Sequence, residues 1–354
     1  MKVAILTFQF AHNYGALLQA YALRRYLKSQ GHTVELTPYY PDWAQREYAI
    51  SPFAKGISMR KRVRFTLQYT KRKRLADSFT EFQKDALKLK SSFDTEDELE
   101  AYLNNFDLVF FGSDQIWNDK ITGDTAAYYG GDIKPDRVSY AASLGTKTLT
   151  PIQEKYVKKY LPRFKAISVR ETTSEEMLKP IVDKPIVSVT DPVFLLRSEE
   201  WEAVCQPANI TGKFMFLYFL KDDHELLRYA KEYADNNGLT IYEVHPTLAQ
   251  FHEGCKPLTE IGPREFIWLI KNAECVCTNS FHATSFSVIF RKKLLHIPNE
   301  VSPERTMALL SYLNLDTGKK PNGLPLYKLD ACDYTHLNEV IEASKGFIQQ
   351  VVSE

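Results

Sequence analysis

Residues 275–290 read CVCTNSFHATSFSVIF, and this stretch decides the fold that we expect. It opens as a short apolar run typical of a buried strand, and from about Ser280 the apolar residues shift to helical spacing. A strand that ends where a helix begins is typical of an open α/β sheet, which keeps its chemistry at that junction. The first N–H groups of such a helix are unpaired and favour an anion.

His282 lies on the first turn of this predicted helix. The helix dipole disfavours a charged imidazole unless a bound anion offsets it, so the proton state of His282 should respond to an anionic substrate. The alternative is a histidine that only packs against its neighbours. Asn279, Ser280 and Thr284 argue against that alternative because polar side chains have little to offer a hydrophobic core. We therefore expect an acid–base role for His282 that is coupled to phosphate binding.

The composition indicates a globular protein with two cores. The chain has 354 residues, of which 44% are hydrophobic and 25% charged, and this length suggests two domains of similar size. A formal net charge of +1 gives no general attraction to nucleic acid. No apolar run reaches the roughly 18 residues of a membrane span, and the first ten residues read as a core strand, so we expect a cytoplasmic protein.

The five cysteines predict neither a disulfide framework nor a metal site. Their number is odd and their spacings match no zinc motif. Cys275 and Cys277 lie two apart on the predicted strand, so they face the same side and behave as small apolar residues. We therefore expect no metal.

Strand and helix patterns alternate along both halves of the chain. The expected strands are 2–8, 32–39, 106–111, 138–142, 166–169 and 187–194, followed by 214–219, 240–244, 274–278 and 294–297. This order predicts an α/β protein with two Rossmann-like domains that face a central cleft. The domains are 1–205, on the acceptor side, and 206–330, on the donor side. An amphipathic helix over 331–354 is expected to cross back to the first domain.

The loop after the first strand is one candidate binding element. Asn13, Tyr14 and Gly15 lie between that strand and the next helix, where backbone N–H groups can approach a ligand. The alternative for Gly15 is a simple tight turn.

The loop GSDQIWN, residues 112–118, is a second candidate. Asp114 is placed as a base or as a ligand to sugar hydroxyls, and Trp117 as a stacking face. We expect Ser113 and Gln115 to contact the substrate with them, together with Ser143 after the strand 138–142. The alternative is that Ser113 or Asp114 only caps a helix.

Arg170 stands at the end of the strand 166–169. A guanidinium there can fork onto a phosphate or a carboxylate, and the alternative is an ion pair with Glu171.

A basic segment lies between the expected strands 32–39 and 106–111. Nine lysine and arginine residues and no acidic residue lie between Lys55 and Arg74. Phe65, Phe79 and Phe82 predict that one long helix begins here, within an insert of about residues 55–90. Such a charge run is either a solvated face or a contact with an anionic surface, such as a membrane or a lipid-linked phosphate.

Five motifs in order resemble the polysaccharide pyruvyl transferase family. They are FAHNYGALLQAYAL (10–23), FGSDQIW (111–117), SVRE (168–171), VTDPVFLL (189–196) and TNSFHATSFS (278–287). Each motif is weak alone, and the specificity lies in the ordered set, which spans about residues 3–312. The resemblance implies a fold similar to GT-B glycosyltransferases. It also implies transfer of an enolpyruvyl-derived group from phosphoenolpyruvate onto two hydroxyls of a sugar, which gives a pyruvate ketal and phosphate.

The resemblance implies roles for individual residues. The family's histidine falls on His282, which would protonate the methylene carbon of the donor. Its loop aspartate falls on Asp114, which would accept a proton from the attacking hydroxyl. The arginine of its S-x-R-[DE] element falls on Arg170, which would bind phosphate with the helix N-terminus at Asn279 and Ser280. No step needs a metal or a redox cofactor.

One position departs from the family pattern. Several members carry an arginine two residues before the histidine, where this sequence has Ser280. Arg305 is our candidate to supply that charge to the donor, with Lys221 and Arg291 as further candidates.

The expected partners are phosphoenolpyruvate and a saccharide acceptor of a cell-surface polysaccharide. The basic segment favours a lipid-linked acceptor and peripheral contact with the anionic inner membrane face. Two alternatives stay open. A GT-B glycosyltransferase using a nucleotide sugar would need an acidic residue to hold a ribose, for which Glu265 or Glu274 is available. A non-catalytic sugar-binding protein is consistent with Ser280.

Overall fold

The computed structural model describes residues 1–51, 58–246, 248, 251–297, 303–315 and 324–353. Lys55, at the start of the predicted basic insert, and residue 354, at the end of the predicted terminal helix, lie outside this set. Within the described residues, no helix combines the length and the apolar character that crossing a membrane requires.

The first half of the chain builds a parallel sheet with the strand order β2-β1-β3-β4-β5-β6. Its central strands are apolar and buried on both faces, as parallel strands covered by helices are. The strands are β1 (Lys2–Leu6), β2 (Thr33–Leu36), β3 (Leu108–Phe111), β4 (Asp136–Ala142), β5 (Ala166–Val169) and β6 (Ile186–Ser188). The helices are α1 (Tyr14–Ser29), α2 (Asp42–Glu47), α5 (Glu96–Leu103), α6 (Asp119–Thr122), α7 (Pro151–Tyr160), α8 (Thr172–Leu178) and α9 (Ser198–Glu202).

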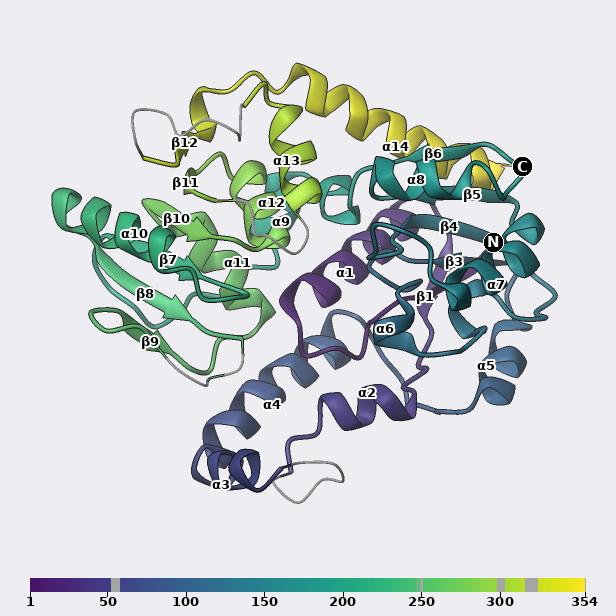
Figure 1. Ribbon diagram of the computed structural model, residues 1–354, viewed down its shortest axis with the longest axis horizontal. Coiled ribbons are helices and arrows are strands. Elements are labelled where there is room, and N and C mark those ends of the chain that lie inside the picture. The colour runs from purple at the N-terminus through teal and green to yellow at the C-terminus, as the bar shows by residue number, and fades with distance from the viewer. Residues whose placement is uncertain (52–57, 247, 249–250, 298–302, 316–323, 354) are drawn as a thin grey trace.

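The second half builds a second sheet with the order β12-β11-β10-β7-β8-β9, parallel except for β12. Its strands are β7 (Phe214–Tyr218), β8 (Thr240–Val244), β9 (Lys256–Leu258), β10 (Cys275–Thr278), β11 (Lys293–Leu295) and β12 (Leu326–Lys328). Its helices are α10 (His224–Asn237), α11 (Pro263–Asn272), α12 (Phe281–Ile289) and α13 (Pro303–Ser311). The predicted α/β class with two Rossmann-like domains is confirmed (Figure 1). The predicted boundary at 205/206 falls between α9 and β7.

Strand order reverses direction once in each sheet. In the first sheet the reversal lies between β1 and β3, and in the second between β7 and β10. Ligands of open α/β sheets bind beyond the carboxyl ends of the strands at such reversal points. The loops after β1, β3 and β10, which hold most of the predicted site, start at these two points.

The two domains share a continuous apolar core. Tyr14, at the start of α1, stacks on Phe266 of α11 with ring centroids 4.1 Å apart, and its hydroxyl donates to the carbonyl of Ile261 at 2.8 Å. Helix α1 also contacts α12. This packing presses the loop after β1 against the helix that follows β10.

The terminal helix α14 (Thr335–Ser353) lies along the first domain (Figure 1). The hydroxyl of Ser344 accepts from the N–H of Thr190, and Lys165 Nζ donates to the carbonyl of Val351. The side chain of Phe347 contacts the ring of Tyr140 in β4.

Two local predictions are wrong. The basic insert forms two helices, α3 (Met59–Leu67) and α4 (Tyr69–Asp85). The helix is interrupted at Gln68, whose side-chain amide donates to the carbonyl of Leu248. Residues 190–194 do not extend the last strand of the first domain. Asp191 caps a 3-10 turn, η3 (Pro192–Leu195), because its Oδ1 accepts from the N–H of Val193.

Candidate active site

A cavity lies between the carboxyl ends of the two sheets. We call it the central cleft. The first domain contributes Asn13, Tyr14, Gly15 and Asp114 to its wall. The second contributes Tyr218, Leu220, Phe266, Ser280, Phe281, His282, Arg305 and Thr306. The structure therefore brings together predicted site residues that lie almost 300 positions apart along the chain.

His282 projects from the first turn of α12 against the N-terminus of α1. A Cβ atom added to Gly15 would lie 2.0 Å from Nδ1 of this imidazole. Only glycine fits opposite the ring, so the role of Gly15 is close approach and not merely a turn. The first turn of α1 is capped by Asn13, whose Oδ1 accepts from the N–H of Ala16 at 3.1 Å.

Asp191 lies on the other side of the imidazole. Its Oδ2 is 3.5 Å from His282 Nε2, an ion-pair contact rather than an ordinary hydrogen bond, and 3.1 Å from Arg170 Nη1. The side chain of Asp191 has no exposed surface. Burial alone would raise the pKa of Asp191, but the positive charges of His282 and Arg170 lower it from 3.8 to about 2. Asp191 is therefore a carboxylate that joins the histidine to the arginine.

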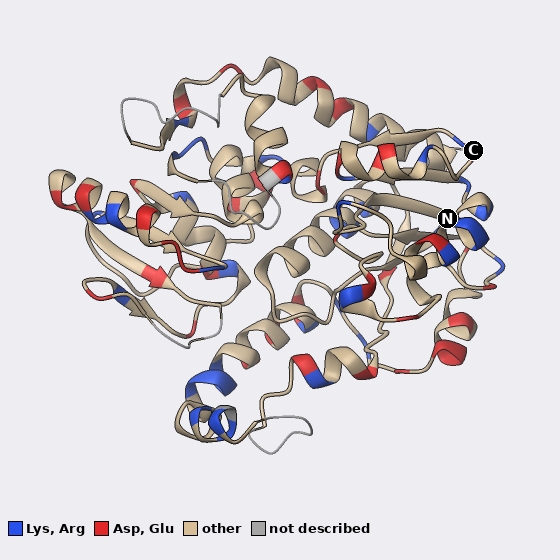
Figure 2. Ribbon diagram, viewed as in Figure 1, with Lys and Arg blue, Asp and Glu red and all other residues tan. Residues whose placement is uncertain are grey.

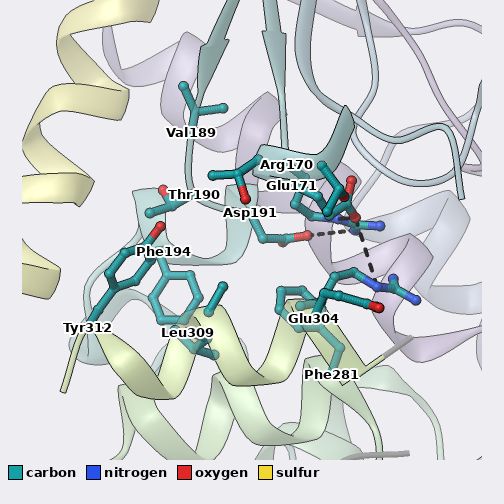
Figure 3. A pocket seen from close by; sticks show the side chains of 14 residues that line it. Arg170, Glu171, Val189, Thr190, Asp191, Phe194, Phe281, Glu304, Leu309 and Tyr312 are labelled. Carbon is teal, nitrogen blue, oxygen red and sulfur yellow. Dashed lines mark hydrogen bonds and ion pairs between the residues drawn. The ribbon is translucent and has the colours of Figure 1, made fainter. Parts of the chain in front are cut away.

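Arg170 is buried among three carboxylates, of which Figure 3 shows Glu171 and Asp191. Its Nη1 contacts Asp191, its Nε lies 3.1 Å from Glu171 Oε1, and its Nη2 lies 3.8 Å from Asp114 Oδ1. Burial opposes the charge, but the three carboxylates outweigh burial and raise the pKa of Arg170. Arg170 therefore forms the ion pair with Glu171 that was its alternative, and it also lies in the candidate site.

Arg305 lies at the start of α13 and faces the same cluster. Its Nε is 3.8 Å from Glu171 Oε1, and its guanidinium lies 5.7 Å from the ring centroid of Phe281. Burial, and then the charge of Arg170, lower the pKa of Arg305. Its side chain is 17% exposed, against 2% for Arg170, so Arg305 is the cation that an entering anion meets first.

A second, smaller cavity adjoins the cluster. Figure 3 shows Phe194, Leu309 and Tyr312 on one side of it and the Arg170–Asp191 pair on the other. Phe281 and Arg305 line both cavities and form the partition between them. The acidic and basic groups are therefore reached from two sides.

Two buried nitrogens of this cluster have no hydrogen-bond partner among the described residues. They are Arg170 Nη2 and His282 Nε2. A buried polar group without a partner costs free energy, and it needs an explanation such as a ligand or a water. Arg170 lines the second cavity and His282 the central cleft, so a ligand or a water in these cavities would supply the missing partners.

Asp114 follows β3 with a positive φ of 80°. Its Oδ1 accepts from the N–H of Gln115 at 2.8 Å, and its carbonyl accepts from the N–H of Ser143 at 3.0 Å. A non-glycine residue in this backbone region is uncommon and is often found at functional sites. The backbone thus turns the carboxylate of Asp114 toward Arg170 and the cleft.

Four residues predicted to contact the substrate line neither of these cavities. Trp117 is fully buried, stacks on Tyr129 and donates from Nε1 to the carbonyl of Tyr128, so the prediction of a stacking face is wrong. The side chains of Ser113 and Ser143 are also buried. Gln115 Oε1 accepts from Asn118. These residues hold the loop that carries Asp114.

The predicted phosphate contacts at the start of α12 need correction. The side chain of Asn279 accepts from the N–H of Leu220 and donates to the carbonyl of Lys221, so it fixes the loop after β7. The N–H of Ser280 donates to Thr278 Oγ1 at 3.0 Å. Phe281 and His282 follow in the first turn of α12, where N–H groups have no partner within the helix.

Three other candidates lie apart from the cluster. Arg291 follows the far end of α12 and stacks on Tyr334 at 4.5 Å. Glu274 precedes β10, at the opposite edge of the sheet from the cleft, so it is not placed to hold a ribose there. Glu265, in the first turn of α11, is partly buried, and burial raises its pKa. No group of three or more possible metal ligands occurs within the described residues.

Sequence reasoning missed Asp191 and Phe281 as parts of the site. Asp191 stands directly before a proline at the end of a short strand, and this helix-cap pattern was the available signal. Nothing local marked Phe281, whose ring lies 5.4 Å from Arg170 and separates the two cavities.

Comparisons with known proteins agree with this architecture. The UDP-GlcNAc 2-epimerase of Neisseria meningitidis bound to UDP-GlcNAc is similar, with a TM-score of 0.50 and 12% identity over 100% of both chains. The S. aureus MnaA–UDP structure gives a TM-score of 0.50 and 12% identity over 98% of this chain and 88% of that chain. At this identity the likeness concerns the fold alone, which is GT-B.

A comparison with curated proteins gives no significant match. The family model for polysaccharide pyruvyl transferases matches residues 13–301, which include Gly15, Asp114, Arg170, Asp191 and His282. The resemblance seen in the motifs is thus confirmed over most of the chain. The chain belongs to the polysaccharide pyruvyl transferase family.

Proposed function

We propose that this protein uses phosphoenolpyruvate to form a pyruvate ketal on a saccharide of a cell-surface polysaccharide or of its lipid-linked precursor. One observation carries the proposal beyond the family. Arg170 Nη2 and His282 Nε2 are buried without hydrogen-bond partners and are tied together by Asp191. An anion binder next to a proton donor is what a phosphate ester activated by protonation requires.

The donor would bind where the two cavities meet. Arg170, Arg305 and a protonated His282 carry three positive charges, and three carboxylates oppose them: Asp114, Glu171 and Asp191. The cluster is therefore neutral when His282 is charged. A bound anion makes the cluster negative and so favours the protonated imidazole. Arg305 would hold one anionic group of the donor. It would thereby take the role of the arginine that several other members carry two residues before the histidine.

The imidazole of His282 would protonate the donor. Asp191 faces Nε2, so a proton on that nitrogen is stabilised and the charge of the ring is supported. Nδ1 lies against the backbone of Gly15, and the ring fills the place that a side chain at Gly15 would take. A ring held between a carboxylate and a close-packed glycine keeps one orientation, as proton delivery requires.

The reaction can be written with its atoms balanced. A proton from His282 adds to the methylene carbon, C2 becomes electrophilic, and the first sugar hydroxyl attacks it while Asp114 takes the hydroxyl proton. The bond between C2 and the phosphate oxygen then breaks, the second hydroxyl attacks C2, and its proton passes to the departing phosphate. Asp114 releases its proton and His282 regains one, so in sum one hydroxyl proton ends in the new methyl group and the other on phosphate, and no redox step is involved.

A nucleotide-sugar transferase is the second candidate. Its support is the GT-B fold, which the UDP-bound relatives share. The position of Glu274 at the far edge of the second sheet weighs against it, while the partly buried Glu265 stays available.

Arg305→Gln tests the donor site. A hydrogen bond to a charged group contributes about 1.5–3 kcal/mol, so the dissociation constant of phosphoenolpyruvate should rise about 10- to 100-fold. Arg291→Gln removes an equal charge at the far end of α12 and is the matched control. Titration calorimetry at fixed ionic strength measures both. Equal weakening by the two variants, or none by Arg305→Gln, would remove the donor from this place.

A further inference from the structure

Helix α3 carries an exposed apolar stripe. Met59, Val63 and Leu67 are 73%, 58% and 83% exposed, and they are the three most exposed large hydrophobic side chains of the described residues. They are spaced four residues apart in a helix, so they lie along one face. Tyr69, 42% exposed, continues the apolar surface at the start of α4. Single exposed apolar residues are ordinary, but an aligned set marks an interaction surface.

Arginines border the stripe on both sides. Arg60 and Arg64 directly follow stripe residues in sequence, so they lie on one flank of the stripe. Arg62 directly precedes Val63 and lies on the other flank. No described carboxylate lies within ion-pair distance of these three, and the pairs Lys73–Asp77 and Arg74–Glu260 begin only further along α4. Figure 2 shows lysine and arginine gathered over α3 and the start of α4. The stripe thus sits within a positive surface.

Helix α3 is attached to the rest of the protein through α4. Arg72 of α4 stacks on Phe65 of α3, with its guanidinium 3.5 Å from the ring centroid, so the inner side of α3 is attached to α4. Further along α4, Phe79 packs on Tyr14, which lines the central cleft. In Figure 1, α3 lies at the outer end of the arm that α4 forms.

We propose that α3 docks this protein on a membrane surface that contains anionic lipids. A helix with an apolar stripe between basic flanks lies in the interface, with the stripe among the acyl chains and the cations at the headgroups. A soluble polyanion would use the arginines but would leave Met59, Val63 and Leu67 in water. The inference does not depend on the reaction proposed above.

Vesicle flotation with the full chain tests the proposal. The vesicles contain phosphatidylcholine alone, or phosphatidylcholine with about a third phosphatidylglycerol. The unaltered protein should float with the anionic vesicles at about 0.1 M salt and bind less well at about 0.5 M, where charges are screened. Equal flotation with both vesicle types, or with neither, would overturn the proposal without any variant.

Two variants separate the apolar from the basic contribution. Arg60→Gln/Arg62→Gln/Arg64→Gln should weaken partition into anionic vesicles about 100-fold, because each basic residue near such a surface contributes about fivefold. Met59→Ser/Val63→Ser/Leu67→Ser should weaken it to a similar degree, on the order of a hundredfold. Phosphoenolpyruvate titration should be unchanged in both, since α3 does not line the cleft.

Matched controls lie elsewhere on the surface. Ile121→Ser/Val187→Ser removes exposed apolar residues, and Lys134→Gln/Lys158→Gln/Lys159→Gln removes exposed charges. Both should keep the flotation of the unaltered protein. Undiminished flotation of the serine variant of α3 would show binding by charge alone. A dimer in sedimentation equilibrium that becomes a monomer in that variant would assign the stripe to a second copy. Either result would overturn the proposal.

Discussion

Replacing His282 by glutamine is expected to lower turnover of phosphoenolpyruvate by about 10²- to 10⁴-fold, the contribution of a general acid. Glutamine has a side chain of similar size beside Gly15 and keeps an N–H group that can face Asp191, but it cannot deliver a proton at neutral pH. The binding of phosphoenolpyruvate should weaken much less than turnover. Phosphate release in single-turnover conditions, with titration calorimetry alongside, separates the two effects.

The control for this variant is His336→Gln. His336 lies on α14 with a side chain that is 57% exposed and lines neither cavity, so turnover should not change. If His282→Gln keeps turnover within a few fold of the unaltered protein, His282 is not the acid and the proton must come from another group.

Asp191→Asn is expected to have the largest effect on stability. The variant leaves Arg170 and His282 without the buried carboxylate that lies 3.1 Å and 3.5 Å from them. Removing one partner of a buried ion pair typically costs about 3–5 kcal/mol, because the remaining charge is no longer compensated. Urea unfolding at pH 7 measures this cost. Turnover should fall as well, since the imidazole loses the group that orients it.

The effect of Asp191→Asn should depend on pH in a defined direction. The pKa of Asp191 is about 2 in the folded protein and 3.8 ordinarily. A folded pKa below the unfolded one adds stability that is complete above about pH 4 and disappears as the pH falls through about 2. The stability difference between the unaltered protein and the variant should therefore be constant from pH 7 to about pH 5 and narrow below pH 4.

Asp124→Asn is the control for the pH dependence. Hydrogen bonds from Tyr156, and next from Lys155, lower the pKa of Asp124, but this carboxylate is exposed to solvent. Exposed ion pairs contribute little to stability, so the variant should unfold much like the unaltered protein. A difference for Asp191→Asn that stays constant down to pH 3 would mean that the carboxylate is not held in its charged form by His282 and Arg170.

The junction between β10 and α12 shows what local sequence determines. The change from a strand-like run to helical spacing at Ser280 placed His282 in the first turn of a helix, and the structure agrees because the spacing of apolar residues reflects which side chains each element buries. Parallel sheets align their carboxyl ends, so Asp114 and Arg170 could be expected at the same edge. The two-domain fold followed from the same patterns.

The parts that could not be predicted depend on distant contacts. Trp117 is buried because Tyr128 supplies a carbonyl for its indole and Tyr129 supplies a stacking ring. Asp191 reaches Arg170 only because β6 pairs with β5. The insert breaks at Gln68, whose amide bonds to the second domain. These partners are distant in sequence, so the spacing of residues within a short segment could not predict the contacts.

Phosphate release from phosphoenolpyruvate is the most direct test of the central claim. The measurement incubates the unaltered protein and His282→Gln with phosphoenolpyruvate and a panel of polysaccharide repeat units, and it follows free phosphate and the mass of the saccharide. We expect phosphate release that depends on the saccharide, a product heavier by one pyruvate ketal, and a loss of both in the variant. No release with any saccharide, together with cleavage of a nucleotide sugar by the same preparation, would contradict the claim.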